Sequence, residues 1–106
     1  MSTLSIITTT VETAAQADAL AAAIIAARLA ACVQITPIQS VYRWKGLVEH
    51  TAERLLIAKT STARADALVA FIRTHHPYEL PEILVTSATA GSPDYLAWVT
   101  QETRPE

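Results

Sequence analysis

A two-residue turn between two long strand-like segments limits the possible folds of this chain more than any other feature. The turn signal is Lys45-Gly46, and strand-like residues flank it on both sides. Two-residue turns of this kind join neighbouring antiparallel strands. The returning segment, residues 47–60, contains four consecutive apolar residues at positions 55–58. Because a strand that is apolar on both faces lies inside a sheet, we expect a long β-hairpin whose second strand is central.

The first strand of this hairpin changes its pattern near Pro37. Apolar side chains occupy odd positions before the proline and even positions after it: Val33 and Ile35, then Ile38, Tyr42 and Trp44. A change of phase by one residue is typical of a β-bulge, and proline is found at bulges or on edge strands. The pattern therefore predicts a bulge or bend near Pro37 and an edge position for this strand.

The segments around the hairpin predict three helices and two further strands. Residues 4–11 are rich in Ile, Val and Thr, which is typical of a strand. Thr13 and Gln16 match a capping box, so we expect a helix from residue 14 to about residue 29. A second helix is expected over residues 63–74 and a last strand over residues 83–88. The sequence Ser92-Pro93-Asp94 then predicts the start of a short closing helix.

This order predicts an α+β fold, a ferredoxin-like βαββαβ sandwich with one antiparallel sheet, an extended hairpin and a short C-terminal helix. Right-handed crossovers place the first and third strands in the middle of the sheet and both long helices on one face. We expect a single domain over residues 1–106. The other face of the sheet would be bare in a chain that is 51% apolar. Subunits that cover each other, sheet against sheet, would bury that face.

Residues 75–83 read HHPYELPEI and place two histidines, two prolines, a tyrosine and two glutamates in one connection. Each proline fixes its own φ and disfavours helical geometry in the residue before it, so a stiff, extended connection is expected. Stiff loops that carry polar side chains are common positions for binding sites. The alternative is that the prolines only end a helix and direct the next strand.

Composition excludes several classes of function. The net charge is −2, which provides no basic surface for nucleic acid and no polybasic membrane patch. The N-terminus lacks the features of a secretion signal, and no uncharged run is long enough to span a membrane. The one cysteine rules out an internal disulfide and suits a reducing compartment. We therefore expect a cytoplasmic protein without nucleic-acid or membrane partners.

Five segments, in order along the chain, resemble the CutA divalent-cation tolerance proteins. They are residues 29–33 (LAACV), 40–46 (SVYRWKG), 59–60 (KT), 76–83 (HPYELPEI) and 93–98 (PDYLAW). The resemblance implies a stable homotrimer of ferredoxin-like subunits, similar in plan to PII signalling proteins. It also implies a link to copper tolerance and binding of copper or another divalent cation, with no organic cofactor. Some members carry further cysteines, whereas this chain has only Cys32.

Candidate metal ligands follow from this resemblance and from side-chain chemistry. Cys32 is a soft ligand, His76 is a borderline ligand, and Glu79 and Glu82 supply carboxylates. The alternative for Cys32 is a buried small apolar side chain, because free cysteines are among the most buried residues. No Cys-x-x-Cys or His-x-x-x-His spacing is present.

Two other classes of function compete with metal binding. A PII-like module would bind a small effector in a cleft between subunits, and Arg43, Lys59 and Tyr78 are candidates to line it. An enzyme would need an oriented nucleophile and a site for an oxyanion, and the sequence contains no recognisable set of this kind. We expect the aromatic residues Tyr42, Trp44 and Trp98 to form trimer contacts and not a ligand stack.

Overall fold

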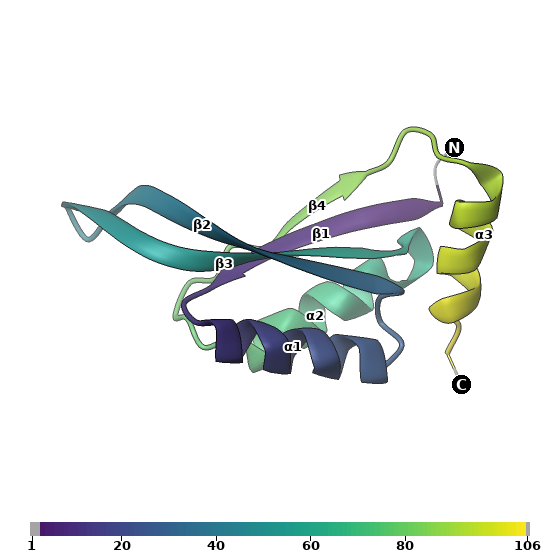
Figure 1. The fold of residues 1–106 in the computed structure, drawn as a ribbon, viewed down its shortest axis with the longest axis horizontal. Coiled ribbons are helices and arrows are strands. Elements are labelled where there is room, and N and C mark those ends of the chain that lie inside the picture. Colours follow the sequence, from purple (N-terminus) through teal and green to yellow (C-terminus); the bar gives the residue numbers. More distant parts are fainter. Residues whose placement is uncertain (1–2, 106) are drawn as a thin grey trace.

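A computed structural model describes residues 3–105 as an antiparallel four-stranded sheet with two helices packed on one face (Figure 1). The strand order is β2-β3-β1-β4, so the first and third strands are central, as predicted. The elements are β1 (Leu4–Val11), α1 (Ala14–Ala26), β2 (Cys32–Trp44), β3 (Leu47–Ser61), the 3₁₀ helix η1 (Thr62–Arg64), α2 (Ala65–His75), β4 (Leu84–Ser87) and α3 (Pro93–Glu102). Positions 1, 2 and 106 of the predicted domain lie outside the described residues.

Helix α1 begins with the predicted capping box and ends three residues earlier than predicted. Gln16 N–H donates to Thr13 Oγ1 at 3.1 Å, and Thr13 N–H donates to Gln16 Oε1 at 3.1 Å. The helix ends because Arg28 adopts a φ of 58°. Arg28 N–H then donates to the carbonyl of Ile25, and Leu29 N–H donates to that of Ile24. This pair of bonds is a Schellman motif, which more often has glycine at the left-handed position.

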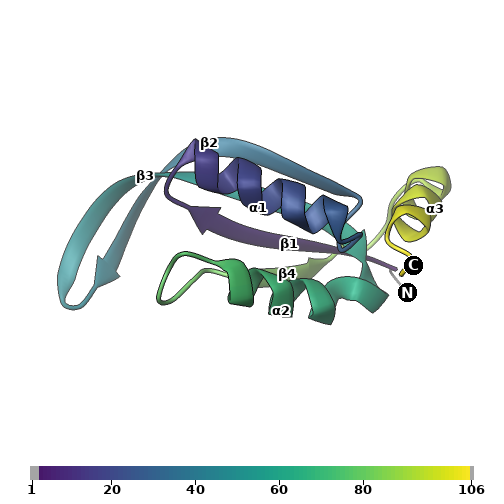
Figure 2. The same ribbon diagram turned by 90° about the horizontal axis from the view of Figure 1, so that it is seen from below.

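The hairpin of β2 and β3 is regular along its whole length. Pairing runs without interruption from Cys32 opposite Lys59 to Trp44 opposite Leu47, so the prediction of a bulge near Pro37 is wrong. The alternative prediction, a bend, agrees with Figure 2, where β2 and β3 curve together. The turn has φ values of 50° at Lys45 and 83° at Gly46, both positive as a type I′ turn requires. The apolar pattern changes phase because the hairpin extends beyond the helices, as Figures 1 and 2 show. Strand β2 is an edge strand, as predicted.

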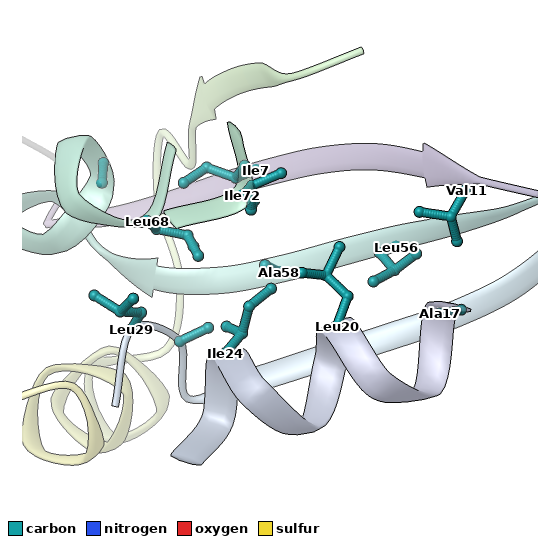
Figure 3. Packing of buried hydrophobic residues seen from close by; sticks show 12 residues of the cluster. Ile7, Val11, Ala17, Leu20, Ile24, Leu29, Leu56, Ala58, Leu68 and Ile72 are labelled. Atoms are coloured by element: carbon teal, nitrogen blue, oxygen red, sulfur yellow. The ribbon is translucent and has the colours of Figure 1, made fainter. Parts of the chain in front are cut away.

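The hydrophobic core lies between the sheet and helices α1 and α2 (Figure 3). Alternate residues of β1 and β3 face the helices, and α1 and α2 each contribute one apolar stripe. The buried members include Ile7, Val11, Leu20, Ile24, Leu56, Ala58, Leu68 and Ile72. This packing fixes which residues of the central strands point away from the helices.

The opposite face of the sheet is covered by neither α1 nor α2, and α3 lies at one end of the sheet (Figure 1). Several large apolar side chains are exposed on this face, on the hairpin and on the connection to β4. Leu47 is 66% exposed, Val48 56%, Leu80 70% and Leu84 59%. None of the helices within residues 3–105 has the length and apolar character needed to cross a membrane.

Candidate functional site

His76 occupies the C-cap position of α2 and ties residues 75–83 to strand β1. Its Nε2 lies 2.8 Å from the carbonyl oxygen of Thr10, and its Nδ1 lies 3.0 Å from the backbone nitrogen of Tyr78. A carbonyl oxygen only accepts and a backbone N–H only donates, so Nε2 carries the hydrogen and Nδ1 accepts. Burial lowers the pKa of His76, against the opposing effects of the Thr10 hydrogen bond and the Glu53 carboxylate. The histidine is therefore neutral, with both ring nitrogens in hydrogen bonds.

Tyr78 ties the same connection to strand β3. Its hydroxyl donates to Glu53 Oε2 at 2.7 Å, and Glu53 is only 6% exposed. Burial and the hydrogen bond to Glu53 raise the pKa of Tyr78 well above its ordinary value of 10. The phenol therefore remains a donor over the whole physiological pH range. Glu53 was not among the residues predicted for the site.

A cleft of about 890 Å³ opens beside this pair of residues. It lies between the distal half of the hairpin and the connection from α2 to β4. Its lining comprises Thr10, Ser40, Val41, Tyr42, Arg43, Trp44, Glu53, Tyr78, Glu79, Leu80, Pro81, Glu82, Ile83 and Leu84. The volume is within the range of small-molecule sites, about 300–1,000 Å³.

The structure brings together the predicted site residues of the hairpin and of residues 75–83. Those that line the cleft are Tyr42, Arg43, Trp44, Tyr78, Glu79 and Glu82. Lys59 does not line the cleft, because its ammonium lies over the Tyr95 ring at 5.9 Å, beside α3. Trp98 is also at that end of the sheet, with its ring centroid 5.6 Å from that of Tyr95.

Cys32 and His76 do not meet within one subunit. Cys32 pairs with Lys59, whereas Thr10, the partner of His76, pairs with Leu55. These two positions on β3 are four residues apart, or about 13 Å at the rise of a β-strand. Cys32 is half-buried at the far end of the sheet. No group of three or more His, Cys, Asp or Glu side chains in the described part of the chain is arranged to hold a metal ion.

Comparison with known proteins gives consistent results. The family described as "CutA1 divalent ion tolerance protein" matches residues 5–102. Protein CutA of Mus musculus is 43% identical over 88 residues, which cover 82% of this chain and 50% of the mouse protein. The chain thus spans about half the length of the mouse relative, and 49% of a rice relative. The divalent-cation tolerance protein CutA of Salmonella newport is 41% identical over 91 residues, which cover 85% of this chain and 79% of that protein.

Solved structures share the fold over nearly the whole chain. CutA from Synechococcus elongatus has a TM-score of 0.94 and 41% identity, covering 98% of this chain and 93% of that one. The same protein complexed with a Bis-Tris molecule has a TM-score of 0.89 and covers 96% of this chain and 95% of that one. A CutA from Archaeoglobus fulgidus, described as periplasmic, has a TM-score of 0.92 and 27% identity, covering 95% of this chain and 99% of that one. With the family match over residues 5–102, these likenesses show that the chain belongs to the CutA1 divalent ion tolerance family.

Proposed function

We propose that this chain functions as a homotrimeric binding protein for divalent cations, with copper as the bound ion, and that it is not an enzyme. Membership of a divalent ion tolerance family is the observation that carries the proposal. The single, unpaired cysteine suits a reducing compartment, so we place the protein in the cytoplasm.

The bare sheet face supports self-association. Leu47, Val48 and Leu84 are large apolar residues that are more than half exposed in one subunit. Large apolar side chains exposed on a hairpin and at the edge of a sheet face that no helix covers are typical of surfaces that bind another subunit. Association of three subunits through these faces and hairpins would bury it. Light scattering at micromolar protein concentration tests this directly, because a monomer mass would exclude the trimer.

Metal binding in this proposal requires ligands from more than one subunit, because Cys32 and Thr10, the residue that His76 contacts, pair with positions of β3 that lie about 13 Å apart. Glu79 and Glu82 are exposed beside the cleft and are available as carboxylate ligands. His76 can coordinate an ion only by giving up one of its two hydrogen bonds. The sheet order thus supports a site between subunits over one within a subunit.

Native mass spectrometry with trace-metal analysis, on protein purified without a His-tag, reports the stoichiometry and the bound metal together. Isothermal titration with copper then tests the ligands through Cys32→Ser, His76→Ala and the double variant. In a shared site the double variant loses little more affinity than one single variant. Additive losses would show two independent sites, and unchanged affinity in all three would exclude both residues as ligands.

A second candidate function is effector binding in the cleft. The specific observation is a concave site of about 890 Å³ lined by predicted effector residues Arg43 and Tyr78. The Synechococcus elongatus protein, which is 41% identical, has been solved with a Bis-Tris molecule. Retention of a small ligand by the purified protein, read in the same native mass spectra, would support this role.

A further inference from the structure

A separate cavity of about 410 Å³ lies at the end of the sheet where α3 ends. Two segments that are distant in sequence form it, namely the link from β3 to α2 and the end of α3 with the residues that follow. Figure 2 shows the end of α3 beside the start of β1 and this link. The polar lining consists of the arginines Arg64 and Arg104 and of five hydroxyl residues, which include Thr3 and Ser61. None of the described residues that line the cavity is acidic.

Hydrogen bonds hold the two sides of this cavity together. Thr103 Oγ1 donates to Ser61 Oγ at 2.9 Å, and both residues are buried. Arg28, just after α1, donates from Nε to the carbonyl of Arg104 at 2.8 Å and from Nη2 to that of Gln101 at 3.1 Å. The end of α3 is therefore fixed against the link from β3 to α2, and the cavity belongs to an ordered part of the fold.

The guanidinium of Arg64 has a donor without a partner. Its Nε is buried and makes no hydrogen bond with any of residues 3–105. A buried donor without an acceptor is costly, and more so when it is charged. Asp66 and Glu102 are each two residues from one of the two arginines, but both are exposed and neither lines the cavity. The cavity is therefore cationic and has no counter-charge from the residues that the structure describes.

The cavity lies away from the surfaces that we assign to subunit contacts. The hairpin extends from the end of the molecule opposite α3 (Figure 1), and the cavity adjoins the start of α2. On α3, Trp98 and Thr100 are about 200° apart around the helix axis, so the cavity and the indole are on opposite sides of this helix. Subunit contacts through the hairpin, the uncovered sheet face and Trp98 therefore leave the cavity open to solvent.

The donors around the cavity indicate the class of ligand. Guanidinium groups match the oxygens of phosphates and carboxylates. A phosphate monoester carries close to two negative charges at pH 7 and so balances both arginines, whereas a carboxylate carries only one. Ser61 Oγ accepts from Thr103, which leaves the hydrogen of Ser61 available to a further oxygen. Ala63 and Pro105 also line the cavity and offer apolar contacts to an organic substituent.

We propose that this cavity binds the phosphoryl group of a small organic molecule, with Arg64 and Arg104 as its charged partners. Ser61 contributes a neutral donor, and Ala63 and Pro105 contact the organic part. The site is independent of the metal and effector sites proposed above, because it shares no residue with either. Its volume is within the range of small-molecule sites, about 300–1,000 Å³.

Isothermal titration of the metal-free intact protein tests the ligand class with propyl phosphate, inorganic phosphate and propyl sulfate. Propyl sulfate has nearly the shape of the phosphate monoester but a single negative charge. We expect propyl phosphate to bind about tenfold more tightly than propyl sulfate, because only the phosphate balances both arginines. Amide NMR shifts of Ala63 and Arg104 report whether binding occurs at this cavity.

The inorganic phosphate titration separates two sources of the phosphoryl group. Weaker binding of inorganic phosphate than of propyl phosphate supports an organic phosphate as the ligand. Equal affinity of the two would support the phosphoryl site and assign free phosphate to it. The proposal is overturned if neither phosphate binds at millimolar concentration, or if propyl phosphate and propyl sulfate bind equally well.

Variants that remove one guanidinium each test the two arginines. Arg64→Gln and Arg104→Gln should each weaken binding of propyl phosphate about tenfold, because each loses a charge-assisted hydrogen bond. Arg104 is exposed and follows α3, so its replacement keeps the test valid even if Arg64→Gln disturbs folding. Arg73→Gln, exposed on α2 and outside the cavity, is the matched control and should leave the affinity unchanged. Unchanged binding in Arg104→Gln, or an equal loss in Arg73→Gln, would overturn the proposal.

Discussion

The hydroxyl of Tyr78 and the carboxylate of Glu53, 25 residues apart in sequence, are joined by a hydrogen bond of 2.7 Å. The bond links the connection that follows α2 to the central strand β3. Because Glu53 is buried and Tyr78 provides its side-chain hydrogen bond, the two residues depend on each other energetically.

Tyr78→Phe should destabilise the fold, because it leaves a buried carboxylate without its donor. We expect the free energy of unfolding to fall by about 1–3 kcal/mol, the usual cost of an unsatisfied buried polar group. Urea denaturation measures it. The control is Tyr42→Phe, because the hydroxyl of exposed Tyr42 makes only a 3.4 Å contact with Thr51, and its loss should cost less than about 0.5 kcal/mol. Equal losses for the two variants would show that the Glu53 contact adds nothing.

His76 should make stability depend on pH in one direction. Its pKa in the folded chain is lower than the ordinary value of 6.5, mainly through burial. The unfolded chain therefore binds more protons than the folded chain between the lowered pKa and 6.5, and unfolding becomes easier there. The contribution of neutral His76 is complete above about pH 6.5 and is lost as the pH falls toward the folded-state pKa.

Melting temperatures at pH 7.5 and pH 5.5, with a chelator present, check this expectation. His76→Gln should show a smaller fall in melting temperature on acidification than the unmodified chain. His50→Gln, at an exposed position on the hairpin, should retain the full fall. The interpretation fails if His76→Gln and the unmodified chain lose the same amount.

Thr9→Val should stabilise the protein. Thr9 is 1% exposed, and its hydroxyl has no hydrogen-bond partner among the described residues. Valine has nearly the same shape and removes the unsatisfied group, so we expect a gain of about 1 kcal/mol in the free energy of unfolding. Thr9→Ser is the matched control, because it keeps the hydroxyl, deletes a buried methyl group and should destabilise. A decrease in stability with Thr9→Val would indicate a partner such as a bound water.

Much of the fold was predictable because its signals are local. The capping box at Thr13, the turn at Lys45-Gly46 and the proline of the closing helix each act within a few residues. The end of α1 could not be predicted, because the sequence has Arg28 at the left-handed position where a Schellman motif usually has glycine. The change of apolar phase near Pro37 was misread as a bulge because the sequence does not show where the helices stop covering the hairpin.

The site was only partly predictable. Residues 75–83 and the hairpin were identified from composition, but Glu53 was missed because strand residues with charges are usually solvated. The sequence did contain a signal that Glu53 is not an ordinary solvated residue, since side chains alternate along a strand and Glu53 shares its face of β3 with the apolar residues Leu55 and Ile57. The separation of Cys32 from His76 depends on strand register, which pairs residues distant in sequence.

Trp44→Ala tests whether the hairpin tip is a subunit contact. Trp44 is opposite Leu47 at the end of the hairpin, beyond the helices, and both Leu47 and Val48 are mostly exposed. A neighbouring subunit that covered this tip would bury the indole, and truncation of a buried Trp costs about 3–5 kcal/mol. We therefore expect a lower melting temperature or a smaller oligomer mass at low micromolar concentration, measured by calorimetry and light scattering. Lys45→Ala is the control, because it removes the side chain whose ammonium lies over the Trp44 ring but leaves the indole in place, and it should leave the mass unchanged. If Trp44→Ala changes neither the melting temperature nor the oligomer mass, the hairpin tip is exposed to solvent and the subunits associate through the sheet face alone.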